Sequence, residues 1–247
     1  MAKRRFVDLH VKSTLSNGYS TPEQIAKMAS YLGYEAIGLA DFNLENIDLI
    51  DKVKRLFRNY GIDLISRINI DVDSPKELKS ILRKIRRKVE IISVFCRNID
   101  VARLAARDRR VDLLIFSVES WKQNFFDSSE AKLALNGESA LEVSLMKIIK
   151  ARSSSYRIKA MRILSENIRI AKKYGVPVVI SSGASSILEM RAPRELAALA
   201  TVFSLSELEA RKSLSEVPMM IVNRNREKLS ENFIMPGVKL IRRGEIG

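Results

Sequence analysis

Residues 6–43 read FVDLHVKSTLSNGYSTPEQIAKMASYLGYEAIGLADFN. Two short apolar runs, 6–11 and 36–39, are typical of buried strands. Between them Pro22 suits the first turn of a helix. Gly33 follows the expected helix end, where glycine adopts the left-handed conformation at little cost. The segment therefore predicts a strand–helix–strand unit whose two strands are parallel.

The same unit recurs along the chain. Further apolar runs occur at 64–70, 91–95, 113–118, 140–145 and 176–181. Gly61 and Gly175 precede two of them, as Gly33 precedes the second strand. We expect the intervening helices to begin near Asn43, Pro75 and Asn98, with a short helix at 128–135 and a long one at about 157–174. Seven βα units favour an α/β fold of the TIM-like barrel type over an open sheet.

After Gly183 the pattern contains helices only, at 193–203, 206–215 and near 222–229. We expect these C-terminal helices, from about residue 190, to flank the barrel. No proline- or glycine-rich linker interrupts the chain, so residues 1–247 are interpreted as a single domain.

The charge of the chain points to a polyanionic partner. Its 43 Lys and Arg against 29 Asp and Glu give a net charge of +14. No stretch approaches the roughly 18 apolar residues of a membrane span, and the basic start leads into a strand rather than a signal peptide. We therefore expect a soluble, cytoplasmic protein with no membrane partner. Cys96 is the only cysteine, which excludes an intrachain disulfide and indicates a small buried side chain.

Residues 6–43 also resemble the polymerase-and-histidinol-phosphatase (PHP) superfamily of metal-dependent phosphoesterases. In that family a His-x-His strand end, a Ser-Asp-Gly turn and a Thr-Asp-His strand end supply metal ligands. This sequence keeps His10 but has Lys12, Asn17 and Phe42 at three ligand positions. His10 is the only histidine, so imidazoles elsewhere cannot rebuild a site. We expect no bound metal and no catalytic residue in the polypeptide.

Two interpretations of the remaining polar residues stay open. In the first, His10 is satisfied near the barrel mouth by a backbone carbonyl, Asp8 or Asp41, and Asp8 is a structural acceptor. In the second, the chain is a divergent PHP-type hydrolase that holds a metal with Asp8, Asp41 and Glu119.

A closer resemblance covers nearly the whole chain. Together with the missing metal ligands, three stretches make the chain similar to the ribonuclease P protein component 3 family. They are LISRINI (64–70), RLAARDRRVDLLIFS (103–117) and VPVVISSGASSILEMRAPRELAAL (176–199). The resemblance implies a subunit of the endoribonuclease that removes the 5′ leader from precursor tRNA. It also implies that the RNA subunit carries the catalytic centre and the Mg²⁺, and that the protein itself binds no cofactor. The implied partners are ribonuclease P RNA, the ferredoxin-like component 2, other protein subunits and, indirectly, precursor tRNA.

Basic helix faces are the first candidates for RNA binding. In the helix expected from Pro75, an apolar stripe faces the core and the opposite face carries Lys76, Lys79, Arg83, Arg86 and Arg87. The helix at 157–174 repeats the pattern with Arg162, Arg169, Lys172 and Lys173. Few acids accompany either face, so we expect phosphate contacts, although a merely solvated basic face is the alternative for each residue.

A second set of candidate RNA-binding residues follows from the expected fold, because functional groups of βα barrels lie at the carboxyl ends of the strands. It comprises Lys12, Arg67, Arg97 and Lys122. The loop Ser181, Ser182, Gly183 and Ala184 is either a phosphate-binding loop or a tight packed turn. Arg191 and Arg194 are expected to contact RNA or a protein partner. Aromatic residues make up only 6% of the chain, so shape and phosphate contacts are expected rather than base stacking. A basic barrel that binds nucleic acid outside this particle is a third possibility.

Overall fold

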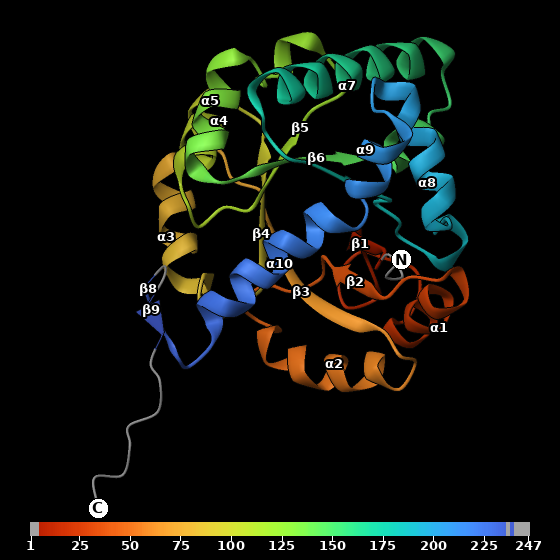
Figure 1. Ribbon diagram of the computed structural model, residues 1–247, viewed down its shortest axis with the longest axis vertical. Helices are drawn as coiled ribbons and strands as arrows, with labels where there is room; N and C mark the ends of the chain where they lie inside the picture. Colours follow the sequence, from red (N-terminus) through yellow and green to blue (C-terminus); the bar gives the residue numbers. More distant parts are fainter. Residues whose placement is uncertain (1–4, 236–237, 240–247) are drawn as a thin grey trace, which may run out of the picture.

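The computed structural model describes residues 5–235 and 238–239. Seven parallel strands form one sheet in the order of the sequence and curve around a common centre, with helices outside them (Figure 1). All seven predicted strands are present. They are β1 (Val7–Val11), β2 (Ala36–Leu39), β3 (Asp63–Ile70), β4 (Ile91–Cys96), β5 (Leu113–Phe116), β6 (Ala140–Ser144) and β7 (Val178–Ser181).

The covering helices alternate with the strands, as the sequence predicts for a TIM-like barrel. They are α1 (Pro22–Leu32), α2 (Ile50–Arg58), α3 (Pro75–Ile85), α4 (Ile99–Arg107), α5 (Ser128–Gly137), α6 (Met146–Ile149) and α7 (Ser154–Tyr174). Their apolar stripes pack on the outward faces of the strands and form the larger core. The helix expected from Asn43 begins later, at Ile50, because the Asn43 side chain accepts from the N–H groups of Glu45 and Asn46 and stabilises a turn instead.

Local sequence explains where these helices begin and end. Thr21 and Gln24 form a capping box at the start of α1, so the first free N–H groups of the helix are satisfied. Gly33, Gly61 and Gly175 adopt φ of 83°, 72° and 76° before β2, β3 and β7. The three helix-to-strand junctions expected at glycine are thereby confirmed.

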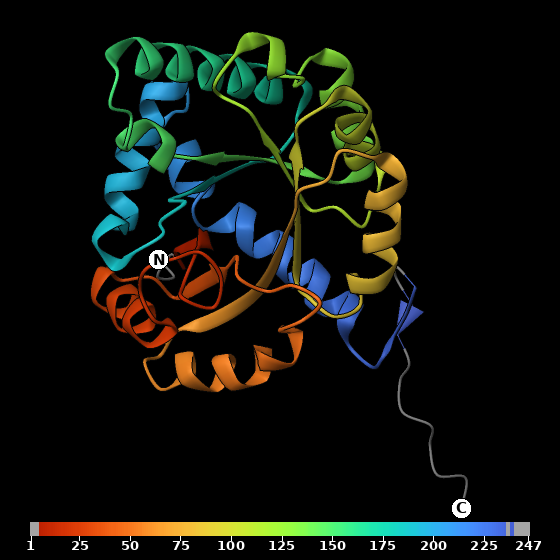
Figure 2. The same cartoon turned by 180° about the vertical axis from the view of Figure 1, so that it is seen from behind.

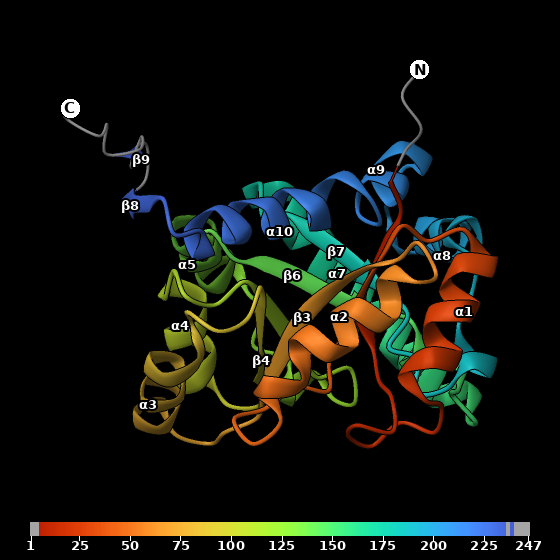
Figure 3. The ribbon, with the colours of Figure 1, turned by 90° about the horizontal axis from the view of Figure 1, so that it is seen from below.

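The amino-terminal end of the barrel is closed. After α8 (Pro193–Ala200) and α9 (Glu207–Lys212), helix α10 (Glu216–Leu229) lies across the strand starts (Figure 3). Met219, Ile221 and Val222 join a second apolar cluster with inward residues of all seven strands. The C-terminal helices thus flank the barrel as expected. The bounds differ, however, because the predicted helix at 206–215 ends at Lys212 and the one near 222 already begins at Glu216.

Polar groups fix α10 in place. Asn225 is fully buried, and its Nδ2 donates to the Glu90 carbonyl at 2.7 Å and to Asp112 Oδ1 at 2.8 Å. Arg226 bonds both carboxylate oxygens of Asp63. Because these acceptors stand at the starts of β3, β4 and β5, the helix is tied to three strands.

The barrel is sealed between β1 and β7 by a few specific bonds instead of a full ladder. The Gly183 N–H donates to the His10 carbonyl at 3.0 Å, and the Lys12 N–H donates to the Ala184 carbonyl at 2.9 Å. Asp8 Oδ1 accepts from the N–H groups of His10 and Ser182, both at 3.1 Å. Asp8 is therefore the structural acceptor that the sequence suggested.

The carboxyl ends of the strands form the opposite, open end of the barrel, the mouth. Helix α10 lies in front of the strands in Figure 1 and behind them in Figure 2, which views the mouth. A short antiparallel hairpin, β8 (Phe233–Met235) with β9 (Val238–Lys239), follows α10 and was not predicted. None of the described helices combines the length and the apolar character that crossing a membrane requires.

Candidate nucleic-acid interface

A buried ion pair fills the barrel interior below the mouth. The Arg67 guanidinium, fully buried, donates from Nη2 to Glu142 Oε2 at 2.6 Å and from Nη1 to Oε1 at 3.0 Å. Ser181 Oγ donates to Glu142 Oε1 at 2.7 Å, and His10 Nδ1 lies 2.8 Å from the same oxygen. His10 Nε2 is 3.3 Å from Asn69 Nδ2. His10 is thus satisfied, but by Glu142 and Asn69 rather than by Asp8, Asp41 or a backbone carbonyl.

An irregularity in β1 turns His10 into this network. Asp8 pairs with Ile37 and Val11 with Leu39, so β1 contains one residue more than β2 over the same stretch. Such a bulge re-aims side chains in a strand. Leu9 therefore stays in the interior apolar cluster while the next residue, His10, also reaches the barrel interior.

The charge balance of this network does not suit a divalent cation. Burial raises the pKa of Glu142, but Arg67 and His10 outweigh it and hold the pKa well below its usual range. Burial and the Arg67 cation lower the pKa of His10. Arg67 Nη2 lies 3.2 Å from His10 Nδ1, so a fixed positive charge already occupies the place beside the one retained PHP ligand position. The residues present do not fit the metal centre of the PHP enzymes.

The carboxylates near the mouth are also engaged. Asp41 accepts from the Ser13 N–H at 2.8 Å and the Ser13 hydroxyl at 2.6 Å, and it bonds the Ser16 hydroxyl. Burial raises the pKa of Asp41, although these serines oppose the shift. Among the residues that the structure describes, no three His, Cys, Asp or Glu side chains lie together as a metal site would require. The set Asp8, Asp41 and Glu119 is therefore not assembled.

The structure contradicts one predicted RNA-binding residue, Arg67, and distinguishes between the two interpretations of the loop 181–184. Arg67 was expected at the barrel mouth, but it lies within β3, and its zero exposure leaves no atom for RNA. The loop 181–184 is the packed turn and not a phosphate loop. Its Ser182 and Gly183 N–H groups bond Asp8 and His10, and Ala184 donates to Ser182 Oγ. A Cβ on Gly183, at φ 71°, would lie 2.0 Å from Ser144 Oγ, which leaves no room for a ligand.

Four cations do surround the mouth. Lys12 is half-buried after β1, Arg97 is exposed after β4, and Lys122 is exposed in the 3₁₀ turn Trp121–Gln123 after β5. Sequence reasoning missed the fourth, Lys147, because it lies in the short helix α6 directly after β6. A lysine one or two residues beyond a predicted strand end is the signal that could have identified it.

The outer helix faces carry fewer free cations than the sequence suggested. Lys76, Lys79 and Arg83 on α3 are exposed, as is Arg87 in the turn after the helix. Arg86 is not available, because its Nη1 donates to Asp112 at 2.8 Å beneath the barrel. On α7, Arg169 pairs with Glu166 and Lys172 with Glu209, which corrects the expectation that this face lacks ion pairs.

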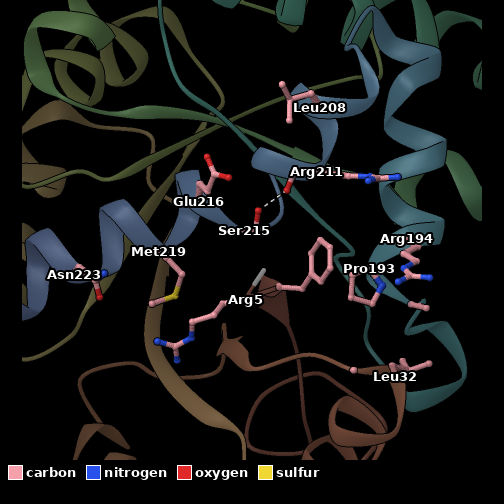
Figure 4. A pocket seen from close by; sticks show the side chains of 13 residues that line it. Arg5, Leu32, Pro193, Arg194, Leu208, Arg211, Ser215, Glu216, Met219 and Asn223 are labelled. Atoms are coloured by element: carbon pink, nitrogen blue, oxygen red, sulfur yellow. Dashed lines mark hydrogen bonds between the residues drawn. The ribbon is translucent and has the colours of Figure 1, made fainter. Parts of the chain in front are cut away.

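Arg191 and Arg194 lie away from the mouth. Arg191 Nη1 donates to the carbonyls of Leu188 and Met190, so this side chain helps to fix the loop before α8. Arg194 lines a groove of about 1060 Å³ at the closed end of the barrel (Figure 4). Leu32, Pro193 and Met219 give that groove an apolar wall.

Known proteins share both the sequence pattern and the fold. The sequence profile of the RNase P subunit p30 family matches residues 5–230. Ribonuclease P protein component 3 of Methanococcoides burtonii is 29% identical over 240 residues, which cover 97% of this chain and 95% of that protein. A chain in the cryo-EM structure of archaeal ribonuclease P with mature tRNA superimposes with a TM-score of 0.82 at 24% identity, covering 97% and 99% of the two chains. Histidinol phosphate phosphatase of Lactococcus lactis has the same fold at a TM-score of 0.55 and 12% identity, with 90% and 94% covered.

Proposed function

The chain belongs to the RNase P subunit p30 family, and we propose that it acts as a protein subunit of ribonuclease P that binds and organises the RNA of the particle. The observation that carries this proposal is the extent of the family match, which runs from the start of β1 through the end of α10. The whole barrel, including the helix that closes it, therefore belongs to the family architecture.

The interior of the barrel supports a non-catalytic role for the isolated polypeptide. Arg67 and Glu142 neutralise each other in the place where a hydrolase of this fold would need metal ligands. The Asp41 carboxylate accepts hydrogen bonds from Ser13 in the loop after β1. With the only histidine also engaged, the chain offers no nucleophile–base pair of the usual kind. We infer that cleavage of the 5′ leader of precursor tRNA belongs to the RNA and to the Mg²⁺ held by it.

The charge distribution supports an RNA partner. The acids at the closed end are matched by Arg86, Arg224 and Arg226. At the mouth, by contrast, no salt bridge joins Lys12, Lys122 or Lys147 to another residue that the structure describes. Cations without carboxylate partners are available to phosphates. We further propose that the chain assembles with component 2 and other protein subunits in the cytoplasm and meets precursor tRNA only through the particle.

A pull-down from cells tests this function. Tagged protein should recover one dominant structured RNA, and the recovered material should cleave the 5′ leader from a precursor tRNA. Recovery of many unrelated RNAs or of DNA without that activity would favour a general nucleic-acid-binding barrel. Hydrolysis of a phosphoester by the protein alone, lost on chelation and on Asp41→Asn, would favour the hydrolase.

A further inference from the structure

A polar pocket opens at the mouth beside β4 and β5. Its volume is about 270 Å³, and its wall is formed by Phe95, Cys96, Arg97, Ile115, Phe116, Ser117, Glu119, Gln123 and Lys147. It lies over β4 to β6, on a different sector of the mouth from Asp41 and the 181–184 turn. Small-molecule sites begin at roughly 300 Å³, so the pocket is larger than a single anion needs and is close to the lower limit for a nucleotide.

Two cations line the pocket, and one of them, Arg97, is paired with Asp71 and keeps only part of its guanidinium for a phosphate. The Arg97 guanidinium is bonded to Asp71 through Nε and Nη2 and stands 5.8 Å from the centre of the Phe95 ring. These contacts fix its orientation, and Nη1 has no hydrogen bond among the described residues. Arginine held in one orientation binds phosphate with little further loss of entropy.

Lys147 faces the same space. Partial removal of its ammonium from water lowers the pKa of Lys147, and Arg97 and Lys12 add to this shift while Glu119 opposes it. The residue as a whole is nevertheless exposed. Arg97 is paired with Asp71, whereas Lys147 forms no salt bridge with another described residue, so its ammonium lacks a carboxylate partner in the pocket wall.

The remaining groups indicate more than a phosphate. Glu119 is a carboxylate in the pocket wall, which disfavours a bare anion but can accept a hydrogen bond from a ribose hydroxyl. Trp121 belongs to the same 3₁₀ turn as the wall residue Gln123 and is 50% exposed. Trp121 is not part of the pocket wall, but it lies two residues from a wall residue, and an exposed indole can stack with a nucleobase.

We propose that this pocket binds one unpaired nucleotide of RNA, with its phosphate on Arg97 and Lys147, a ribose hydroxyl on Glu119 and its base on Trp121. The proposal rests on the RNA-binding function given above and adds a site to it. It also revises the expectation that base stacking plays no part.

Trp121 supplies the readout, because it is the only tryptophan in the chain. The full-length protein is titrated with a five-nucleotide RNA bearing a 5′ hydroxyl, with the same RNA bearing a 5′ phosphate, and with inorganic phosphate. Both RNAs should quench the tryptophan fluorescence, whereas inorganic phosphate should not. Tighter binding of the 5′-phosphorylated RNA would assign the site to a terminal phosphate, and equal binding to a backbone phosphate.

Variants locate the site, with affinity read from the anisotropy of the labelled RNA. Lys147→Ala and Trp121→Ala should each weaken binding on the order of tenfold, and Trp121→Phe should retain most of it. Lys159→Ala, an exposed lysine on α7, is the control with the same charge change. Each variant is also tested on the full-length RNA recovered with the protein. If wild type and variants bind that RNA and the short RNA equally, the pocket is no nucleotide site although the function stands. If wild-type protein does not bind the full-length RNA, the proposed function itself fails.

Discussion

Among single residues, the most constrained set is the buried ion pair of Arg67 and Glu142 in the interior of the barrel. Arg67 contributes the positive charge, Glu142 the negative charge, and His10 with Ser181 completes the hydrogen bonding. A buried pair of this kind compensates the cost of removing its charges from water only while both partners are present. The network is therefore sensitive to loss of one member.

We expect Arg67→Met to lower the free energy of unfolding by about 3–5 kcal/mol, because Glu142 would remain charged and unpaired in the interior. The double variant Arg67→Met, Glu142→Leu should recover much of that loss, and Arg162→Met, an exposed control, should lie close to wild type. Urea denaturation measures all three. The RNA affinity of the folded fraction should stay unchanged in Arg67→Met. A marked drop in that affinity would mean that Arg67 takes part in RNA binding.

Asp8 makes a second prediction at this scale. Burial raises the pKa of Asp8 from 3.8 to about 6, although hydrogen bonds from Ser182 and His10 oppose the shift. Asp8 Oδ2 has no hydrogen-bond partner among the described residues. A carboxyl group with a raised pKa contributes stability that is complete below the unfolded pKa and is lost as the pH rises through the folded pKa. From pH 4 to pH 7 this loss amounts to about 2 kcal/mol.

Asp8→Asn keeps a side-chain oxygen that can accept from the N–H groups of His10 and Ser182, and it carries no charge. Its free energy of unfolding should therefore rise relative to that of wild type between pH 4 and pH 7. Denaturation at several pH values measures the difference, with Asp48→Asn on the exposed surface as the control. A difference that stays constant over this range would show that Asp8 titrates normally.

At the scale of elements, helices with similar basic patterns have different roles. Helix α3 presents Lys79 and Arg83 to solvent, and Arg87 in the turn after it is also exposed, whereas the neighbouring Arg86 reaches beneath the barrel to Asp112. Helix α10 directs Arg224 and Arg226 inward to the acids at the strand starts. The position of a cation relative to the closed end decides whether it serves stability or remains available to a ligand.

We expect Lys79→Ala, Arg83→Ala and Arg87→Ala together to weaken RNA binding and to reduce the slope of log affinity against log salt by about 0.7–0.9 per lost contact. Filter binding over a range of salt concentrations measures both. The matched control removes three exposed cations from α2, Lys52, Arg55 and Arg58, with the same change in net charge. Equal effects of the two triple variants would mean that net charge alone acts.

The fold of α3 should survive this change. Its apolar stripe of Leu78, Leu82 and Ile85 is buried against the barrel and is untouched by the substitutions. Leu82→Ala should by contrast cost about 2–5 kcal/mol of stability and leave the salt slope of the folded fraction unchanged.

At the scale of the whole molecule, the barrel separates a closed end from an open one. Helix α10 and its buried Asn225 seal the strand starts, while the opposite mouth gathers Lys12, Arg97, Lys122 and Lys147. With a net charge of +14, the chain can neutralise RNA phosphates that would otherwise need diffuse counterions.

We therefore expect the chain, added with component 2 to the RNA of the particle, to lower the Mg²⁺ concentration needed for precursor-tRNA cleavage. Cleavage rates over a Mg²⁺ series measure the effect. Arg67→Met, Glu142→Leu protein is the control, because it retains the surface cations. The assigned role would be contradicted by a Mg²⁺ requirement that is the same with and without the chain.

The barrel could be predicted from residue types along the chain, because each βα unit carries its own apolar run, helix start and terminal glycine. So could the loss of the metal ligands, since Lys12 and Phe42 cannot coordinate a metal ion and His10 has no second imidazole to join it. These properties are local, and residue types along the chain are sufficient to predict them.

The roles of the polar residues could not be predicted in this way, because they depend on contacts between distant parts of the chain. Arg67 and Glu142 are 75 residues apart, and nothing in their local patterns indicates that they meet in the interior. The bulge that turns His10 inward depends on the register between β1 and β2. Arg83 and Arg86 have similar sequence surroundings, but only Arg86 reaches a buried carboxylate. Lys147 and Arg97 line the same pocket because β4 and β6 end at the same mouth. Which charges are paired depends on distances across the fold, and the sequence does not state these distances.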